Sequence, residues 1–118
     1  MFRVIVAGSR DFSDYPLLCR TLDHLLSCQT DIVVVCGKAR GADTLGEQYA
    51  KAHGYQIDYY PADWKKFGKA AGYLRNKQMA ENADALVAFW DRQSRGTRHM
   101  IELAKQHGLK VRVVHYQV

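Results

Sequence analysis

The stretch Ala83-Asp84-Ala85-Leu86-Val87-Ala88-Phe89-Trp90-Asp91-Arg92-Gln93-Ser94-Arg95-Gly96-Thr97-Arg98-His99-Met100-Ile101-Glu102-Leu103-Ala104 decides the fold. Its first part, Asp84 to Trp90, is mostly apolar without clean alternation, which is typical of a strand buried on both faces. A short polar loop with one glycine follows, and the remaining apolar residues have the spacing of an amphipathic helix.

The loop Ser94-Arg95-Gly96-Thr97 places two hydroxyls, a guanidinium group and a glycine where this helix is expected to begin. A helix N-terminus carries unpaired N–H groups and a partial positive charge, so it is a natural site for a phosphate group. The alternative is that Ser94 or Thr97 simply caps the helix. This stretch alone leaves both interpretations open.

The same strand-then-helix pattern recurs along the whole chain. Strands are predicted over Phe2–Ala7, Asp31–Cys36, Gln56–Tyr60, Asp84–Trp90 and Lys110–His115. Four helices are predicted between them: one after the cap Ser13 or Asp14, a second that ends at about His53, a third over about Tyr73–Asn82 and a fourth over Thr97–His107. Lys65–Gly72 is predicted as a basic loop. This βαβαβαβαβ order predicts a Rossmann-like, doubly wound α/β fold with a five-stranded parallel sheet, strand order 3-2-1-4-5 and helices on both faces.

Composition and length point to one cytoplasmic domain over residues 1–118. The chain is 47% hydrophobic, enough for a core. No apolar run reaches membrane-spanning length, and the N-terminus enters a strand directly, unlike a signal peptide. The cysteines Cys19, Cys28 and Cys36 form an odd set without CxxC spacing, which favours reduced thiols over disulfides or zinc.

Positive charge concentrates in the loops that follow the strands. The net charge is +5, and eleven of the seventeen Lys and Arg residues lie in or beside these loops. A generally basic surface is one explanation. Because ligands of open parallel sheets bind beyond the carboxyl ends of the strands, we instead expect an anionic ligand or a nucleic acid at that edge. The predicted ligand-binding residues are Gly8, Ser9, Arg10, Gly37, Lys38, Arg40, Gly41, Ala42, Asp43, Asp63, Trp64, Arg75, Asn76, Trp90, Asp91, Ser94, Arg95, Gly96 and Thr97.

Individual motifs in these loops admit a structural interpretation as well. Gly37-x-x-x-Gly41-Ala42-Asp43 has the shape of a phosphate loop, but it lacks the ending of a Walker A motif, and Asp43 could cap the following helix. Trp64 and Trp90 could stack on a base or close the end of the core. The five histidines show no metal-ligand spacing, so neither a metal nor a cofactor is predicted.

Taken together, the motifs resemble the SLOG superfamily, and within it the small YspA/YpsA-related branch. The resemblance rests on Gly8–Phe12, Gly37–Asp43, Pro61–Trp64, Arg75–Met79 and Ala83–Arg98. It implies binding of a nucleotide or nucleotide-derived ligand, such as an ADP-ribose derivative, with its phosphates against the Gly37–Asp43 and Ser94–Thr97 loops.

The enzymatic relatives, the lonely-guy phosphoribohydrolases, cleave the N-glycosidic bond of nucleoside monophosphates. Arg75 matches their arginine, whereas Asn76 stands at their lysine position and His99 at their acidic position. A carboxylate is the usual stabiliser of an oxocarbenium-like state. Arg75 and, as a substitute acid one turn along the helix, Glu102 are therefore the candidate catalytic residues.

Three functions follow from this reasoning. The first is a module that senses or sequesters a nucleotide ligand, and the second is an N-glycosidase acting on nucleoside phosphates. The third, ranked last, is single-stranded nucleic-acid binding, as in the related DNA-processing protein A. No membrane partner is predicted, and a homo-oligomer stays open.

Overall fold

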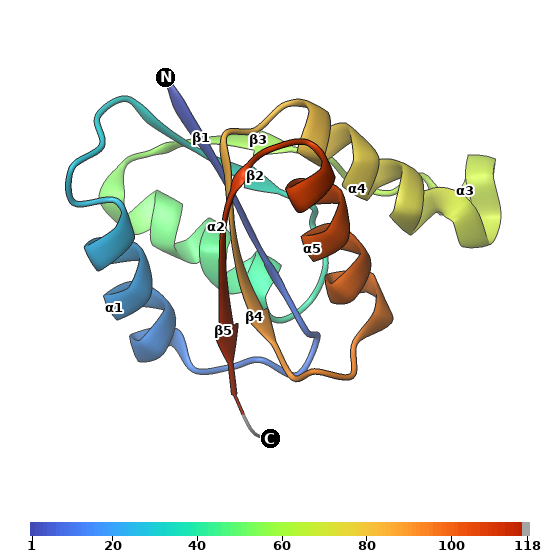
Figure 1. Ribbon diagram of the computed structural model, residues 1–118, viewed down its shortest axis with the longest axis horizontal. Coiled ribbons are helices and arrows are strands. Elements are labelled where there is room, and N and C mark those ends of the chain that lie inside the picture. The colour runs from blue at the N-terminus through green and yellow to red at the C-terminus, as the bar shows by residue number, and fades with distance from the viewer. Residues whose placement is uncertain (117–118) are drawn as a thin grey trace.

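Five parallel strands form the centre of the computed structural model, which describes residues 1–116 (Figure 1). In chain order the elements are β1 (Phe2–Gly8), α1 (Tyr15–Leu25), β2 (Ile32–Cys36), α2 (Ala42–His53), β3 (Gln56–Tyr59), α3 (Trp64–Phe67), the 3-10 helix η1 (Gly68–Ala70), α4 (Ala71–Glu81), β4 (Ala85–Trp90), α5 (Arg95–Gln106) and β5 (Lys110–His115).

The strand order is β3-β2-β1-β4-β5, which confirms the predicted topology. β1 lies in the middle, where Val4 is opposite Val34 of β2 on one side and Ala85 of β4 on the other. After β3 the chain crosses back to the other side of β1, so the strand order reverses between β1 and β4. The loops after these two strands therefore diverge, which opens a crevice at the C-terminal edge of the sheet.

The helices cover both faces of the sheet, as predicted. Figure 1 shows α1 and α2 on one side and α4 and α5 on the other. On the first side Leu18 and Leu22, one helical turn apart, are fully buried with Tyr49. On the second side Met79 and Met100 are buried against the strands. Two apolar layers therefore hold the sheet rigidly between them.

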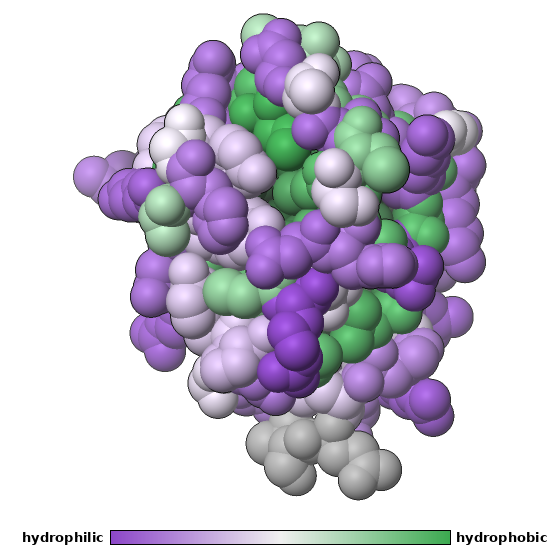
Figure 2. Space-filling model, turned by 90° about the vertical axis from the view of Figure 1, so that its left-hand side faces the viewer, coloured by the Kyte–Doolittle hydropathy of each residue, from purple (hydrophilic) through white to green (hydrophobic). Residues whose placement is uncertain are grey.

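The outer surface on the α1 side is mostly hydrophilic, with hydrophobic residues visible in the hollows between polar ones (Figure 2). Within residues 1–116, no helix combines the length and the apolar character needed to cross a membrane.

Local signals placed several helix ends correctly. The side chain of Asp14 accepts a hydrogen bond from the Leu17 N–H at 3.0 Å, so Asp14 caps α1. Gly54 ends α2 in the left-handed conformation, with φ of +71°.

The prediction of a loop over Lys65–Gly72 is wrong. Asp63 accepts a hydrogen bond from the Lys66 N–H at 3.1 Å and starts the short helix α3. The turns continue through η1, so α4 begins at Ala71 and not at Tyr73. Helix α5 likewise begins at Arg95, two residues before the predicted Thr97, because Ser94 is its cap. A cap is a local signal that acts within three residues. The charged and glycine-containing composition of these segments suggested loops, so the caps Asp63 and Ser94 were overlooked.

Candidate functional site

Two adjoining cavities lie at the C-terminal edge of the sheet. The first, of about 110 Å³, opens between the ends of β1 and β4 and is lined by Ala7, Gly8, Arg10, Ala39, Asp43, Arg75, Asn76, Met79, Ser94, Gly96, Thr97 and Met100. The second, of about 460 Å³, is lined by Arg10, Gly37, Lys38, Ala39, Arg40, Pro61, Ala62, Trp64 and Arg75. Arg10, Ala39 and Arg75 line both, so the two cavities form one crevice.

Arg75, in the second turn of α4, is fixed between the cavities. Its Nη1 donates a hydrogen bond to the Gly37 carbonyl, and its Nε donates to Asn76 Oδ1 at 3.0 Å. A guanidinium group has five N–H donors, so the remaining donors can serve a ligand. Held from two sides, this side chain is preorganised for an anion.

Asn76 connects this arginine to the start of α5. The buried Asn76 amide donates from Nδ2 to the Gly96 carbonyl at 3.3 Å, and Nδ2 also lies 3.3 Å from Nδ1 of His99. Burial lowers the pKa of the His99 imidazole, against a smaller opposing effect of Glu102. A neutral imidazole accepts a hydrogen bond through Nδ1, which is the role that this geometry requires.

Asp43 contributes a buried carboxyl group to the first cavity. Its Oδ2 accepts a hydrogen bond from the Ala39 N–H at 3.2 Å, which holds the loop after β2. Burial raises the pKa of Asp43 to about 6, while the Ala39 N–H and the Arg75 charge pull in the opposite direction. The carboxyl group thus changes charge close to neutral pH.

The second cavity is strongly basic. Arg10, Lys38, Arg40 and Arg75 line it, and none of its described lining residues is acidic. The Lys38 ammonium group lies 3.4 Å from Glu47 Oε1 and 4.9 Å from the centre of the Tyr59 ring, at the outer side of α2. The arginines are therefore the main source of positive charge for a ligand.

Two glycines bring the loops of the site into close contact. Gly41 has φ of +76°, and a Cβ at this position would lie 2.2 Å from the Ser9 carbonyl oxygen. A Cβ at Gly8 would lie 2.3 Å from the Phe89 carbonyl oxygen. Both positions need glycine for packing of backbone against backbone, whether or not a ligand is bound.

Ser9 lies beneath the crevice and joins the two central strands. The residue is 2% exposed, and its Oγ accepts a hydrogen bond from the Asp91 N–H at 3.2 Å. We expect Ser9→Ala to lower the free energy of unfolding by about 1–2 kcal/mol, because the Asp91 N–H loses its acceptor in a buried place. Urea denaturation measures this loss. Ser13→Ala, at an exposed serine of the same loop, is the control, and equal stability of the two variants would contradict the prediction.

Twelve of the predicted ligand-binding residues line the crevice: Gly8, Arg10, Gly37, Lys38, Arg40, Asp43, Trp64, Arg75, Asn76, Ser94, Gly96 and Thr97. The residues that line neither cavity are Ser9, Gly41, Ala42, Asp63, Trp90, Asp91 and Arg95.

Trp90 and Asp91 have structural roles. Trp90 Nε1 donates to the Ser94 carbonyl at 3.1 Å, and the ring packs on the α5 side of the core. Asp91 Oδ1 accepts from the N–H groups of Gln93 and Ser94, each at 2.8 Å, which forms the turn before α5. These bonds lower the pKa of Asp91.

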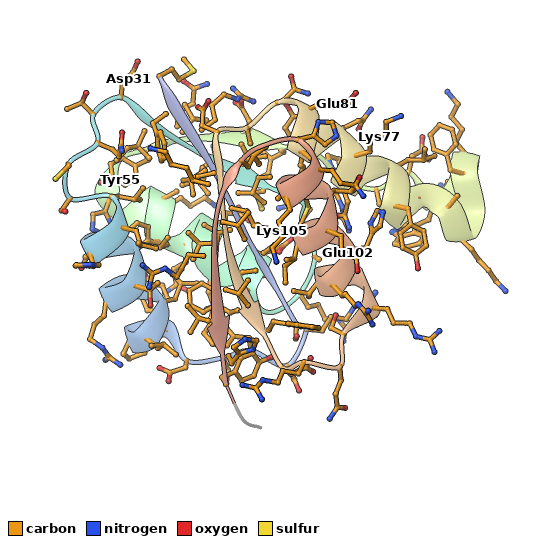
Figure 3. All side chains as sticks on the ribbon, viewed as in Figure 1. Asp31, Tyr55, Lys77, Glu81, Glu102 and Lys105 are labelled. Carbon is orange, nitrogen blue, oxygen red and sulfur yellow. The ribbon has the colours of Figure 1, made fainter. Side chains whose placement is uncertain are left out.

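The position of Glu102 does not support its predicted catalytic role. Glu102 lies on α5 (Figure 3) and lines neither cavity, and its exposed carboxylate pairs with Arg98 at 3.2 Å. Glu102 is one helical turn beyond Arg98 on the same side of the helix, whereas Thr97 and Met100 point inward.

The lining residues absent from the prediction are Ala7, Ala39, Pro61, Ala62, Met79 and Met100. Two of them had a usable signal. Met79 is four residues after Arg75, and Met100 is three residues after Thr97, so each shares a helix face with a predicted residue.

The fold and the cavities thus define an α/β protein of Rossmann type. Its basic crevice lies at the topological switch point of the sheet. The sequence pattern of the YspA, cpYpsA-related SLOG family matches residues 2–67, and the chain belongs to this family. It is 37% identical to the gene 61 protein of Mycobacterium phage D29, over 118 residues and 94% of each chain.

The X-ray structure of TM1055 has the same fold, with a TM-score of 0.68 over 94% of this chain and 72% of that chain, at 22% identity. Family membership points to binding or processing of a nucleotide-related ligand. It specifies neither the ligand nor whether the ligand is only bound or also processed.

Proposed function

We propose that this protein binds a nucleotide-derived ligand of the ADP-ribose kind in the crevice, as a sensor or a sequestering module. The observation that carries the proposal is the junction of the two cavities at Arg75 and Arg10, at the switch point of a parallel sheet. An anion held there would meet two guanidinium groups and the start of α5.

The two cavities of the crevice differ in chemistry in a way that suits such a ligand. In the first cavity, Gly96 offers backbone without a Cβ in the first turn of α5, where the helix dipole favours a phosphate. The second cavity lies within the ~300–1,000 Å³ range of small-molecule sites, and Trp64 provides an aromatic wall for a base. A phosphate would occupy the first cavity and a nucleoside the second.

Binding without hydrolysis is supported by the two positions at which the chain departs from the hydrolase pattern. Asn76 and His99, which stand where lysine and an acidic residue are expected, contact each other. A neutral amide and a neutral imidazole replace two opposite charges together.

Calorimetry with AMP, ADP-ribose, cyclic ADP-ribose, NAD and uncharged adenosine tests the proposal. We expect heat from at least one phosphate-bearing compound and none from adenosine, because the arginines require an anion. Absence of heat from every compound at millimolar concentration would defeat the proposal.

Gly96→Ala tests whether the ligand approaches this backbone. A Cβ at Gly96 meets no atom within 4 Å, so the substitution is expected to raise the free energy of unfolding by about 0.5–1 kcal/mol through helix propensity. The same methyl group is expected to weaken ligand binding at least ~10-fold, because it occupies the place of the phosphate. Thermal unfolding and calorimetry measure the two effects. Unchanged affinity in the stabilised variant would show that the phosphate lies elsewhere.

N-glycosidic hydrolysis is the second candidate, and the Asp43 carboxyl group favours it. For hydrolysis the nucleoside would lie in the first cavity, where an acid with a pKa of about 6 beside Arg75 is suited to donate a proton to the departing base as the C1′–N bond breaks and water adds to C1′. Release of free base from AMP, lost in Asp43→Asn, would support it. A ligand that binds and is recovered intact after long incubation would dispose of it.

A further inference from the structure

A projecting surface on α3 and α4 combines exposed aromatic side chains with lysines. We call it the α3–α4 surface; it consists of Trp64, Lys65, Lys66, Phe67, Lys69, Tyr73, Leu74 and Lys77. Figure 1 shows α3 extending beyond α4, away from the sheet. Trp64 is 55% exposed and Tyr73 51%, which is unusual for residues of this size.

The charge of this surface has one sign. From Trp64 to Ala80 the sequence holds no Asp or Glu, and the four lysines of the surface are all exposed. Lys66 Nζ lies 5.1 Å from the centre of the Phe67 ring, so cations and rings alternate closely. A partner that fits must be anionic and must offer flat or apolar groups.

The α3–α4 surface is continuous with the crevice. Trp64 belongs to both, because it lines the second cavity and also lies 3.5 Å from the position of a Cβ on Gly72, at the start of α4. Arg75, one turn further along α4, lines both cavities. Arg75 and the lysines therefore extend from the place proposed for a nucleotide to the tip of α3, and the exposed carboxylate of Asp63 lies among them as the cap of α3.

We propose that the α3–α4 surface holds a single strand of nucleic acid whose terminal nucleotide occupies the crevice. The inference rests on the proposed function and extends it, because the ligand becomes the end of a polynucleotide. Lys65, Lys66 and Lys69 contact the following phosphates, and Trp64 stacks on a base at the mouth. Aromatic stacking and backbone neutralisation are the two interactions that single strands need.

The shape of the crevice favours the terminal nucleotide of a strand over an internal one. Ala7, Met79 and Met100 line the first cavity and are all buried, so they close its floor. The cavity holds only about 110 Å³, which leaves room for a phosphate group but not for a strand that enters and leaves again. Only a terminal nucleotide can enter without doubling the strand back on itself.

A second copy of this chain is a poor occupant of the same surface. The chain carries a net charge of +5, and two such surfaces face to face would bring eight lysines together without a carboxylate. Like charges in direct opposition oppose association.

Fluorescence anisotropy with a labelled ten-nucleotide single strand, compared with AMP as the mononucleotide, tests the inference. Trp64→Ala is expected to lower oligonucleotide affinity about 10- to 100-fold, the range for loss of one base–aromatic stack. The three lysine–phosphate contacts by themselves predict a decrease in affinity of about 20-fold between ~50 and ~200 mM salt, from a slope of about −0.7 per contact.

The charge variant Lys65→Gln/Lys66→Gln/Lys69→Gln is expected to remove most of this salt dependence and to bring the ratio of oligonucleotide to mononucleotide affinity near one. Its matched control is Arg20→Gln/Lys110→Gln/Arg112→Gln, which removes the same charge from α1 and β5. The control is expected to keep the ratio and most of the slope. Equal behaviour of the two variants would overturn the inference.

Further outcomes separate this inference from the proposed function. If AMP binds and the oligonucleotide binds no more tightly, the inference fails and the proposed function stands. If neither binds, the proposed function fails and the inference fails with it. A circular strand of the same sequence has no end to enter the crevice and is expected to bind more weakly than the linear strand, and equal binding of circular and linear strands would overturn the end-binding geometry. Binding of anionic vesicles or polyglutamate, without binding of the oligonucleotide, would also overturn it.

Discussion

Arg75→Ala is expected to lower the affinity for the nucleotide ligand by about 10- to 150-fold. The guanidinium group lines both cavities and is already held by the Gly37 carbonyl and by Asn76 Oδ1. A hydrogen bond to a charged group contributes about 1.5–3 kcal/mol, and ~2.7 kcal/mol corresponds to ~100-fold in affinity. Calorimetry with the best ligand of the panel measures the loss.

Two further variants separate position from charge at this site. Arg75→Lys keeps the charge but cannot hold Gly37 and Asn76 while it contacts an anion, so we expect an affinity between those of Arg75→Ala and the unmodified protein. Arg98→Ala is the control, because Arg98 is exposed on α5 and lies outside both cavities. An Arg98→Ala variant that loses as much affinity as Arg75→Ala would mean that overall charge, and not the crevice, attracts the ligand.

The fold could be predicted because buried strands and amphipathic helices leave a strong periodic signal. Ile32–Cys36 and Ala85–Phe89 are buried throughout, and both were predicted as covered strands. Topology then follows from general rules of connection, which is why the strand order was also correct. The loop prediction failed at Lys65–Gly72, because the cap Asp63 starts a helix there although the composition suggests a loop.

The site was predictable at the level of loops and less so at the level of side chains. Fold topology brings the loops that follow the strands to one edge, whereas the direction of each side chain depends on its own hydrogen bonds. Ser9 and Asp91 are polar and lie in the right loops, yet they bond to the backbone of neighbouring segments. Trp90 is turned toward Ser94 in the same way. The Ser9–Asp91 bond in particular connects residues 82 positions apart, which no pattern in the sequence relates.

The contact between Asn76 and His99 illustrates the same limit. Each position was recognised as a departure from the hydrolase pattern, but their separation of twenty-three residues hides that they meet. The structure turns two separate departures into one change in the chemistry of the site.

The buried carboxyl group of Asp43 leads to the second large prediction, which concerns pH. Its pKa in the folded protein is about 6, above the ordinary value of 3.8, because burial disfavours the charged form. The folded protein therefore holds this proton more tightly than the unfolded chain does. Stability is expected to fall as pH rises from about 4 to about 6, by about 3 kcal/mol at 1.36 kcal/mol per pKa unit, and to receive no further change from this group above that range.

Asp43→Asn should remove this decline, because the amide keeps an acceptor for the Ala39 N–H and carries no charge at any pH. The variant is expected to match the unmodified protein near pH 4 and to exceed its stability above pH 6. Urea denaturation across this range measures both. Asp63→Asn, at an exposed carboxylate that caps α3, is the control and should leave the decline in place. Parallel profiles for the unmodified protein and Asp43→Asn would contradict the assignment.

The same carboxyl group connects pH to ligand binding. An anion placed in the first cavity, beside Asp43, disfavours the ionised carboxylate further and raises its pKa. Binding near pH 6.5 should therefore take up a fraction of a proton, which calorimetry detects as a dependence of the binding heat on the ionisation heat of the buffer. Asp43→Asn should abolish this dependence and keep the binding itself. If proton uptake persists in the variant, another group takes up the proton on binding, and the anion does not lie beside Asp43.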